Sequence, residues 1–408
     1  MKKMDYKEAA LLLEKTINPV ETEDIPIEKC LGRVLGSDIT AAENVPAFDR
    51  SPYDGYAFRA EDTTDASETK PVTLQVVENI RAGQMPAQKI ESGMATRLMT
   101  GAPIPEGANA VCKYEDTEFT DESVTIKNEY KPGDNVVTAG EDIREGTVVL
   151  NKGYRIDAGM MGTLASLGIM SVSVYRTPIA GILSTGDEVV EAGEFLPPGK
   201  IRNSNRYTIA AALESIGVQT VYLGQAADTV EDICRLIREG EDKCDMLIST
   251  GGVSVGDYDL VPDAMKECGY EIPVRGVAMK PGMACAYGIK KEHSKTRLML
   301  GLSGNPASSL TNLQCVCYPA IKKMMGLDQY EHQVVQIKVG DEIKKGAGKG
   351  TRFVRGRIAF RDGDIFFDSP SSQGNIVISS AARCDAYGVI SGLKAPIKTG
   401  TKINVFSV

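Results

Sequence analysis

Carboxylates follow glycines at the end of an apolar stretch in this chain. The stretch LISTGGVSVGDYD (247–259) leads from apolar residues through several glycines to Asp257 and Asp259. Glycines let main-chain N–H groups approach an anion closely, as they do in loops that bind phosphate. Carboxylates beside a phosphate indicate a hard divalent cation, typically Mg²⁺, that bridges the two negative groups. The stretch therefore predicts a phosphate site with a metal ion beside it.

The same order of apolar run and glycine loop occurs three times between residues 178 and 309. GILSTGDE contains Asp187 and Glu188, LISTGGVSVGD follows later, and LMLGLSGNPASS is the third; Asp228 follows another apolar run, TVYLGQ. Loops at the carboxyl ends of parallel strands share one ligand site. None of them matches GxxxxGK[ST] or a dinucleotide-binding GxGxxG in context, which disfavours an ordinary nucleoside triphosphatase or dehydrogenase. For an isolated aspartate such as Asp259, the alternative is a helix N-cap.

The composition narrows the class of protein. The 408 residues suit about two to four domains, and no apolar run reaches the ~18–20 residues of a membrane span. A formal net charge of −9 disfavours a bulk nucleic-acid-binding protein. The two histidines, His293 and His332, sit among charged residues, so we expect surface positions and no Ser-His-Asp chemistry. Nine scattered cysteines without a CxxC pair indicate reduced thiols in a cytoplasmic protein.

The elements that must position the loops follow from residue patterns. Apolar spacing predicts a helix over 5–17 rather than a signal peptide, and a second helix is expected around IPIEKCLGRVL. Short β-type runs fill 46–140, and DAGMMGTLASLG predicts a short helix that ends at Gly168. From residue 178 strands alternate with helices, which predicts a parallel sheet covered by helices. Residues 327–408 return to short strands typical of a small β-barrel or sandwich.

A series of stretches, in order along essentially the whole chain, resembles the motifs of the molybdopterin molybdenumtransferase family, the MoeA and gephyrin E-domain type. They are FDRSPYDGYAFRAEDT, TRLMTGAPIPEGANAV, AGEDI, GILSTGDEVV, GKIRNSN, LISTGGVSVGDYD, VAMKPGMA and GLSGNPASS. No single motif is specific, whereas the ordered set is highly specific. The resemblance implies a multidomain α/β plus β fold. Its central domain would be a parallel, doubly wound α/β domain similar to the molybdopterin-adenylating proteins, with flanking β-rich domains and a small C-terminal β-barrel.

The resemblance also implies domain boundaries, partners and a location. The expected domains are an elongated linker and dimerisation domain (1–45 plus 141–176), a β-rich domain (46–140), an α/β molybdopterin-binding domain (177–326) and a C-terminal β-barrel (327–408). The protein would be a cytoplasmic homodimer. A molybdopterin-adenylating protein and molybdoenzyme-delivery proteins are the implied partners, while nucleic acid and membrane are not.

The implied activity inserts molybdate into adenylylated molybdopterin, releases AMP with Mg²⁺ assistance and yields molybdenum cofactor. The residues implied to be catalytic are Asp54, Thr100, Glu188, Asp228, Asp259 and Lys280, and those implied to hold the metal are Glu188, Asp228, Asp257 and Asp259. The residues expected to bind the pterin ligand or molybdate are Thr185, Gly186, Asn205, Ser249, Gly251, Gly252, Ser254, Gly256, Ser303, Gly304, Asn305, Pro306, Arg355 and Ser380. Asp54 and Thr100 are expected to reach the site from the partner subunit, and ordinary turn positions are their alternative.

Molybdate is a tetrahedral dianion and needs cationic and N–H donors. Lys280, Arg355 in the basic stretch KKGAGKGTRFVRGR, and Ser379 or Ser380 are the candidates that the resemblance supplies. The alternative for the basic stretch is a solvated strand edge. Arg202, Asn203 and Asn205 in IRNSN would position phosphate or pterin amide groups.

The chain departs from the family pattern at three places. Ser303 stands where the family usually has proline, Met283 and Ala284 replace the lysine and proline of PGKP, and Gly276 occupies an often basic position beside Arg275. Each change removes rigidity or positive charge from the expected anion pocket. A tungstate-preferring variant and a non-catalytic pterin-binding or scaffold homologue therefore stay open. A pterin adenylyltransferase is a further alternative, which the flanking β-rich domains disfavour.

Overall fold

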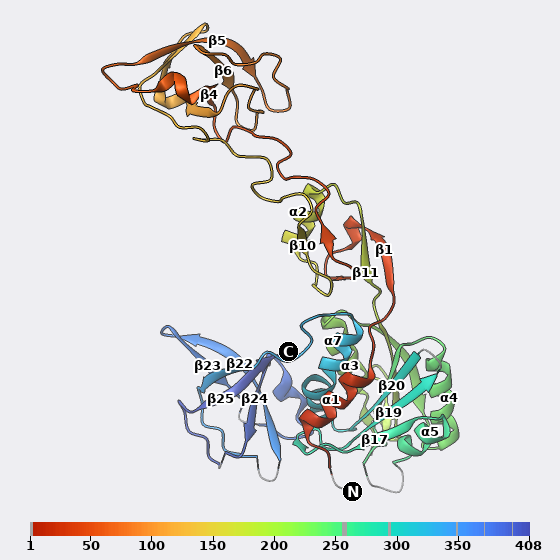
Figure 1. Cartoon of the computed structure of the whole chain (residues 1–408). Coiled ribbons are helices and arrows are strands. Elements are labelled where there is room, and N and C mark those ends of the chain that lie inside the picture. Colours follow the sequence, from red (N-terminus) through yellow and green to blue (C-terminus); the bar gives the residue numbers. More distant parts are fainter. Residues whose placement is uncertain (1–2, 255–258, 293–294, 348–349, 371, 394) are drawn as a thin grey trace. The chain divides into compact units, whose positions relative to one another are not determined.

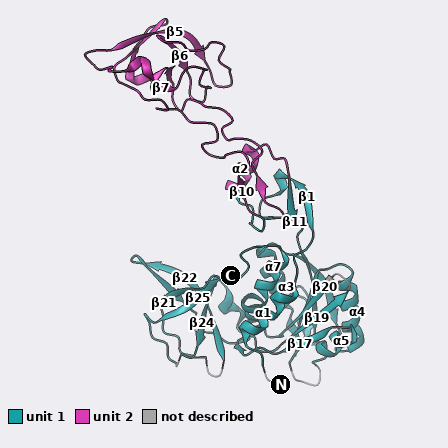
Figure 2. Cartoon of the chain, viewed as in Figure 1, with its two compact units in different colours: residues 1–36, 152–157, 172–408 teal, residues 37–151, 158–171 magenta. Residues whose placement is uncertain are grey.

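The computed structural model describes residues 3–254, 259–292, 295–347, 350–370, 372–393 and 395–408. The chain forms two compact units, one of residues 1–36, 152–157 and 172–408, the other of residues 37–151 and 158–171 (Figure 2). The division into four domains stays a prediction. No helix among these described residues has the length and apolar character needed to cross a membrane.

The larger unit contains a six-stranded sheet in the order β15-β12-β16-β20-β19-β17. Four strands are parallel, as predicted: β15 (Gln219–Ala226), β12 (Ile179–Thr185), β16 (Met246–Thr250) and β20 (Lys295–Leu302). Two further strands, β19 (Cys285–Glu292) and β17 (Glu271–Arg275), extend the sheet in antiparallel fashion. Every residue of β16 is buried, which is typical of a parallel strand covered on both faces.

Helices cover both faces of this sheet (Figure 1). One face, with Ile182 and Ile248, packs against α1 (Tyr6–Thr16), α3 (Ser204–Ser215), α6 (Pro306–Asn312) and α7 (Tyr318–Met324). The other face, with Leu183 and Leu247, packs against α4 (Val230–Glu241) and α5 (Val261–Glu267). Because neighbouring strand residues point to opposite faces, one sheet serves two cores. The doubly wound α/β domain is thus confirmed, and its parallel strands all end at the edge that carries the glycine loops.

The C-terminal part of the larger unit is a closed barrel. Its five strands are β21 (Val335–Val339), β22 (Thr351–Arg361), β23 (Asp364–Asp368), β24 (Ala386–Ser391) and β25 (Lys402–Ser407). The ring closes because β22 pairs with both β23 and β24. The 3₁₀ turn η5 (Ile378–Ala381) connects β23 to β24, and β18 (Met279–Lys280) adds a short parallel pairing to β22. The barrel that the sequence suggested, rather than a sandwich, is therefore the structure.

The second unit is built on a β-sheet, as expected for its sequence. The sheet has the order β7-β4-β6-β5-β9-β8, with β4 (Gly55–Phe58), β5 (Val72–Ile80), β6 (Met94–Leu98), β7 (Ala110–Lys113), β8 (Thr117–Phe119) and β9 (Ser123–Ile126). A short pair, β3 (Ile39–Thr40) and β10 (Val148–Leu150), and helix α2 (Ala158–Ser166) complete it. The helix ends before Gly168, whose φ of 68° only glycine adopts readily.

The helix expected around IPIEKCLGRVL was wrong. This stretch contains the end of β1 (Thr22–Pro26), one turn of 3₁₀ helix (Ile27–Lys29) and β2 (Val34–Leu35), and the two strands flank β11 (Ser171–Tyr175). Pro26 has no N–H to donate within a helix, and Gly32 turns the chain with a φ of 76°. The helix expected over 5–17 is confirmed as α1, and Asp5 caps it by accepting the Lys7 N–H at 2.9 Å.

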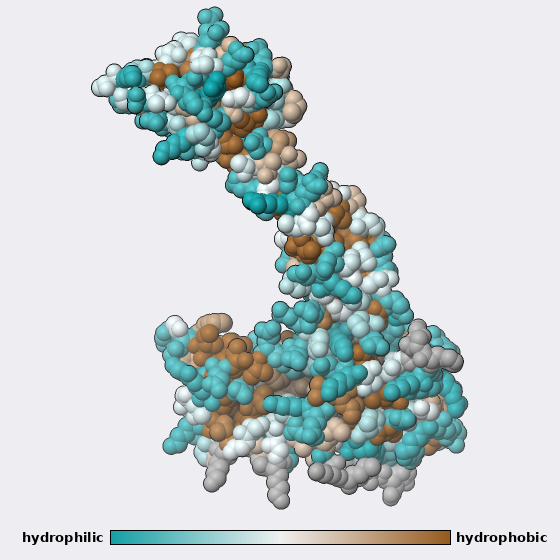
Figure 3. Space-filling view, viewed as in Figure 1, coloured by the Kyte–Doolittle hydropathy of each residue, from teal (hydrophilic) through white to brown (hydrophobic). Residues whose placement is uncertain are grey.

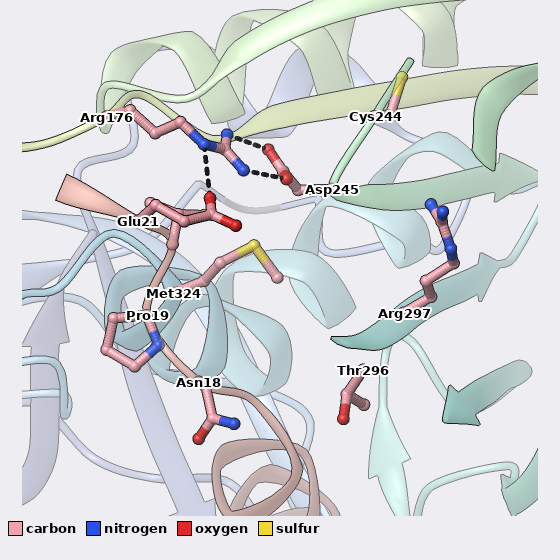
Figure 4. Close-up of a pocket in the computed structure, with 10 residues that line it drawn as sticks. Asn18, Pro19, Glu21, Arg176, Cys244, Asp245, Thr296, Arg297 and Met324 are labelled. Carbon is pink, nitrogen blue, oxygen red and sulfur yellow. Dashed lines mark hydrogen bonds and ion pairs between the residues drawn. The ribbon is translucent and has the colours of Figure 1, made fainter. Parts of the chain in front are cut away.

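A small pocket of about 130 Å³ lies at the amino ends of the parallel strands (Figure 4). Arg176 donates to both carboxylate oxygens of Asp245, at 2.7 and 2.5 Å, and to Glu21 at 2.9 Å. Arg297, which also lines the pocket, donates to Glu292 at 2.8 Å. These ion pairs hold the chain where it enters the sheet. The glycine loops follow the opposite ends of the same strands, so the pocket is not part of the candidate site.

The surface position expected for His332 was wrong. Its ring stacks on Phe406 with a centroid separation of 4.1 Å, and burial together with Lys322 lowers its pKa to about 4, an effect that main-chain groups of Gln314 and Cys315 partly offset. The other histidine, His293, lies outside the described residues.

The half-buried imidazole of His332 predicts an acid-sensitive contribution to stability. Because the pKa in the folded protein lies below the ordinary value of about 6.5, the unfolded chain binds more protons between these values. Stability is thus present above about pH 6.5 and falls toward pH 4, by about 2–3 kcal/mol from this residue. Melting temperatures of the wild type and His332→Phe between pH 7 and pH 4.5 test this. The melting temperature of the variant, which keeps the stack on Phe406, should fall less with decreasing pH than that of the wild type. Identical pH dependence of the two proteins would contradict the prediction.

Candidate functional site

The three glycine loops meet at the carboxyl ends of β12, β16 and β20. The Gly251 N–H donates to the Leu302 carbonyl at 3.0 Å, which joins the second loop to the end of β20. A Cβ on Gly251 would lie 2.8 Å from Thr185 Oγ1, and a Cβ on Gly304 would lie 3.6 Å from the Gly251 Cα. Gly251 also has a φ of 97°, so both space and backbone conformation require glycine there. The convergence predicted from the sequence is therefore present.

The three loops form a glycine cradle around Thr185, Gly251 and Gly304. Helix α3 supports this cradle from one side. The Asn205 amide donates to the Gly304 carbonyl at 2.9 Å, and the Ser309 hydroxyl donates to the Asn205 carbonyl oxygen at 3.3 Å. Asn203, the N-cap residue of α3, donates to Ser184 Oγ at 3.0 Å. Both asparagines of IRNSN are thus tied to the loops. Arg202 donates instead to carbonyl groups of its own segment, Glu191, Ala192 and Glu194.

Ser303 has a local role at the position where a proline was expected. Its hydroxyl accepts the Asn305 N–H at 3.2 Å, immediately before Pro306 begins α6. A side-chain hydrogen bond of this kind fixes a turn that proline would fix through its ring. Ser249 is fully buried inside the sheet, and Ser254 is exposed, with its carbonyl 3.4 Å from the Arg275 guanidinium.

Two of the predicted metal-binding carboxylates flank the first glycine loop. The Asp187 N–H donates to Asp228 Oδ2 at 3.2 Å, and Glu188 folds back so that a Cβ on Gly186 would lie 2.5 Å from its Oε2. Their oxygen ligands suit a hard cation completed by waters and phosphate oxygens. Among the described residues no group of three histidine, cysteine, aspartate or glutamate side chains could hold a metal ion. The fit to Mg²⁺ thus rests on these two carboxylates.

The second loop is described only in part. Gly256 and Asp257 lie outside the described residues, so the structure leaves their predicted roles open. Helix α5 begins at Val261 with Leu260 as its N-cap residue. The alternative that Asp259 caps this helix is therefore wrong.

Arg355 is fully buried in the barrel, so the solvated strand edge is wrong for this residue. Its Nε and Nη2 donate to Ser380 Oγ at 3.1 and 2.8 Å, and Nη2 also donates to the Gly374 carbonyl at 3.2 Å. These partners are a hydroxyl and a carbonyl, and Nη1 is buried without a hydrogen-bond partner among the described residues. Burial lowers the pKa of the guanidinium. A buried cation with a donor left over favours a bound anion.

Of the residues that hold Arg355, the sequence pointed to Ser380 but not to Gln373 or Gly374. Gln373 accepts the Arg355 N–H at 3.1 Å and donates to its carbonyl at 2.9 Å, next to Gly374. Ser379, the second serine considered, lies in η5 beside Ser380. A glutamine in a loop carries no pattern that would have marked it.

Helix α6 connects the cradle to the barrel. Its Asn312 donates to the Gly282 carbonyl at 2.8 Å, and its Thr311 hydroxyl lies 3.4 Å from the Tyr387 hydroxyl of β24. The helix also packs against η5, which carries Ser380. The loop after Lys280, the glycine cradle and the surroundings of Arg355 are thus held by one helix within one unit.

A cation lies beside Met283, which stands where the family pattern has a lysine. Lys280 is exposed, and the Lys3 amine lies 2.6 Å from the Met283 sulfur. The Met4 N–H donates to the Gly276 carbonyl at 3.2 Å, which fixes the chain there. A lysine from the N-terminus therefore brings positive charge close to two of the positions where the sequence lacks it.

Asp54 and Thr100 form a pair in the second unit. The Thr100 N–H and hydroxyl donate to Asp54 Oδ1 at 2.6 and 2.8 Å, and these bonds lower the pKa of the carboxyl. The pair is thus a preorganised, ionised group. Its expected arrival from a partner subunit stays a prediction.

Three family descriptions match the chain in order. Residues 4–168 match the MoeA N-terminal region (domain I and II), residues 181–323 a probable molybdopterin binding domain, and residues 336–408 the MoeA C-terminal region (domain IV). A Bacillus subtilis protein named molybdopterin molybdenumtransferase is 36% identical over 392 residues, covering 95% of this chain and 90% of that protein. A Staphylococcus epidermidis protein of the same name is 32% identical over 403 residues, covering 98% and 95%.

A solved structure shows the same architecture. The molybdopterin biosynthesis MoeA protein of Pyrococcus horikoshii OT3 is similar with a TM-score of 0.85 and 28% identity, and 100% of each chain is covered. The sequence matches and this structure agree with the α/β domain, the β-rich unit and the closed barrel described above. The chain belongs to the MoeA family.

Proposed function

We propose that this chain is a molybdopterin molybdenumtransferase, which transfers molybdenum from molybdate to adenylylated molybdopterin and releases AMP. Relatives that carry this name share 36% and 32% of their aligned residues with it. The observation that carries the proposal is Arg355, a fully buried guanidinium in the same unit as the cradle, whose Nη1 has no hydrogen-bond partner among the described residues. Molybdate, a dianion, is a matching ligand for it.

The remaining roles follow from the geometry of the cradle. Main-chain N–H groups around Gly251 and Gly304 would bind the pterin phosphate, and Lys280 would add an exposed cation. Glu188 and Asp228 would hold Mg²⁺, which when bound supplies neutralisation of the charge that develops as the adenylate bond breaks. Asp259 follows the second glycine loop in the sequence, and its assignment as a catalytic and metal-binding residue is part of this proposal.

The experiment is a turnover assay on the purified full chain. With adenylylated molybdopterin, Mg²⁺ and molybdate, we expect AMP release together with molybdenum bound to the pterin. A parallel arm with tungstate decides the oxyanion preference. No AMP release at saturating molybdate would refute the proposal. Tight pterin binding without turnover would instead support the scaffold alternative, and ATP-dependent pyrophosphate release would support an adenylyltransferase.

A cytoplasmic homodimer is part of the same proposal. Figure 3 shows apolar surface over the barrel, where Phe360 and Ile365 are paired across β22 and β23 and are 78% and 46% exposed. Exposed apolar patches are typical of protein interfaces. Light scattering on the purified protein would give the mass, and a monomer at assay concentrations would rule out a contribution of Asp54 from a second subunit.

A further inference from the structure

The segment between β12 and α3 carries Glu188 and has its own short sheet. In it, β13 (Val189–Val190) pairs in parallel with β14 (Ile201–Arg202). The Ile201 N–H donates to the Glu188 carbonyl at 2.8 Å, and the Asn203 N–H donates to the Val190 carbonyl at 2.8 Å. The backbone from Glu188 to Val190 is therefore held by main-chain bonds, and Gln225 of β15 (Gln219–Ala226) donates to the Gly186 and Val189 carbonyls at 2.8 and 3.1 Å. Beyond Val190, the segment needs a further attachment to the domain.

Glu191 supplies this second attachment, next to the one made by Gln225. Its Oε1 accepts from Asn203 Nδ2 at 2.9 Å and from the Tyr222 hydroxyl at 3.2 Å. Its Oε2 accepts from Arg206 Nη1 at 2.6 Å and from the Tyr207 hydroxyl at 3.4 Å. The Glu191 side chain is 27% exposed, so water screens its contacts less than it screens those of a fully exposed ion pair. Burial raises its pKa, but the bonds from Asn203 and Arg206 outweigh burial, and the pKa is lowered overall.

The partners of Glu191 lie on elements that build the cradle. Asn203 also donates to Ser184 Oγ at 3.0 Å, one residue before Thr185 in the first glycine loop. The Arg206 guanidinium lies 3.8 Å from the centre of the Tyr222 ring, a cation–π contact that fixes both partners. One carboxylate thus joins the segment of Glu188, the start of α3 and strand β15.

We propose that Glu191 is a positioning residue for molybdenum transfer, which acts by holding the 186–203 segment so that Glu188 faces the cradle. The proposal rests on the function proposed above. Glu191 itself contacts no expected substrate group, because both of its oxygens are occupied by side chains of the protein. Removal of a residue that orients a catalytic ligand lowers activity by about 10- to 100-fold in typical cases.

The test is a double-mutant cycle on the full chain. Glu191→Ala is expected to lower kcat about 10-fold or more and to change KM for the pterin little. Glu191→Gln should recover part of kcat, since its amide oxygen still accepts from Asn203 but no longer pairs with Arg206. In a Glu188→Ala background, Glu191→Ala should reduce the residual rate no further, because its effect passes through Glu188. An equal reduction in both backgrounds would overturn the proposal and indicate a general structural role.

Hydrogen exchange gives a readout that does not need turnover. The Ile201 and Asn203 amides should lose protection in Glu191→Ala, while Glu194→Ala, an exposed glutamate in the same segment, should leave them unchanged. Unchanged protection in Glu191→Ala would refute the proposal whether or not the protein turns over. A wild type that releases no AMP would refute the proposed function alone.

Discussion

Replacement of Arg355 by methionine is expected to reduce molybdate-dependent AMP release by about 10²- to 10³-fold, the usual effect of removing a donor to a developing or bound oxyanion. The same change should leave the melting temperature unchanged or raise it. A buried cation without a carboxylate partner is stabilised poorly, and apolar replacements of buried charges are often neutral or stabilising. Ser380 keeps a partner in the variant, because its hydroxyl also donates to the Val377 carbonyl at 2.6 Å.

A large loss of turnover without a loss of melting temperature distinguishes an arginine retained for function from one retained for structure. The matched control is Arg357→Met on the same strand, whose side chain is 60% exposed and should tolerate the change with a normal rate. Turnover and thermal unfolding are measured on all three proteins. Wild-type turnover in Arg355→Met would remove the residue from the anion site. A large drop in its melting temperature would show that the guanidinium is retained for the barrel instead.

Replacement of Glu188 by alanine is expected to lower kcat by about 10²-fold or more while the dissociation constant for adenylylated molybdopterin changes little. The pterin phosphate is expected to bind main-chain groups around Gly251, which the substitution leaves in place. Glu188 lies against Gly186, and the Asp228 carboxylate accepts the N–H of the adjacent residue Asp187, so the substitution removes one of the two carboxylates proposed to hold the cation.

Single-turnover AMP release and equilibrium pterin binding measure the two effects separately. Glu194→Gln removes the same charge from an exposed position in the same segment and should keep the wild-type rate. If the alanine variant binds pterin normally and turns over like the wild type, Glu188 has no role in the reaction. Higher Mg²⁺ should restore part of the lost rate, because a weakened site is filled at higher concentration.

Much of the scaffold could be predicted from local patterns. Alternating strands and helices dictate a parallel sheet, and parallel strands place their glycine loops at one edge, which is where Thr185, Gly251 and Gly304 meet. The failures have physical causes, one local and one distant in the sequence. A proline and a glycine broke the helix expected around IPIEKCLGRVL, and His332 is covered by the stack on Phe406, which the charges next to it in sequence did not reveal.

The surroundings of individual side chains were beyond the sequence, because they depend on register and on distant contacts. The register of β22 places Arg355 opposite Tyr387 of β24, and its side chain is buried, although the stretch KKGAGKGTRFVRGR around it is rich in basic residues. The Lys3 amine contacts Met283, which is 280 residues away in the sequence. A comparison with the local family motif therefore indicates a missing positive charge, whereas the folded chain places one there. Glu191 belongs to no motif, and only its four partners reveal it.

The order in which the units occur along the chain has a consequence for synthesis. The second unit is an almost continuous insertion, residues 37–151 and 158–171, within the larger unit. A growing chain can complete this insertion as soon as it leaves the ribosome, since chains fold domain by domain from the N-terminus. Helix α1 can pack in its native position only much later, because its packing partner α7 ends at Met324. The apolar face around Leu13 therefore stays without its native packing partner through most of translation.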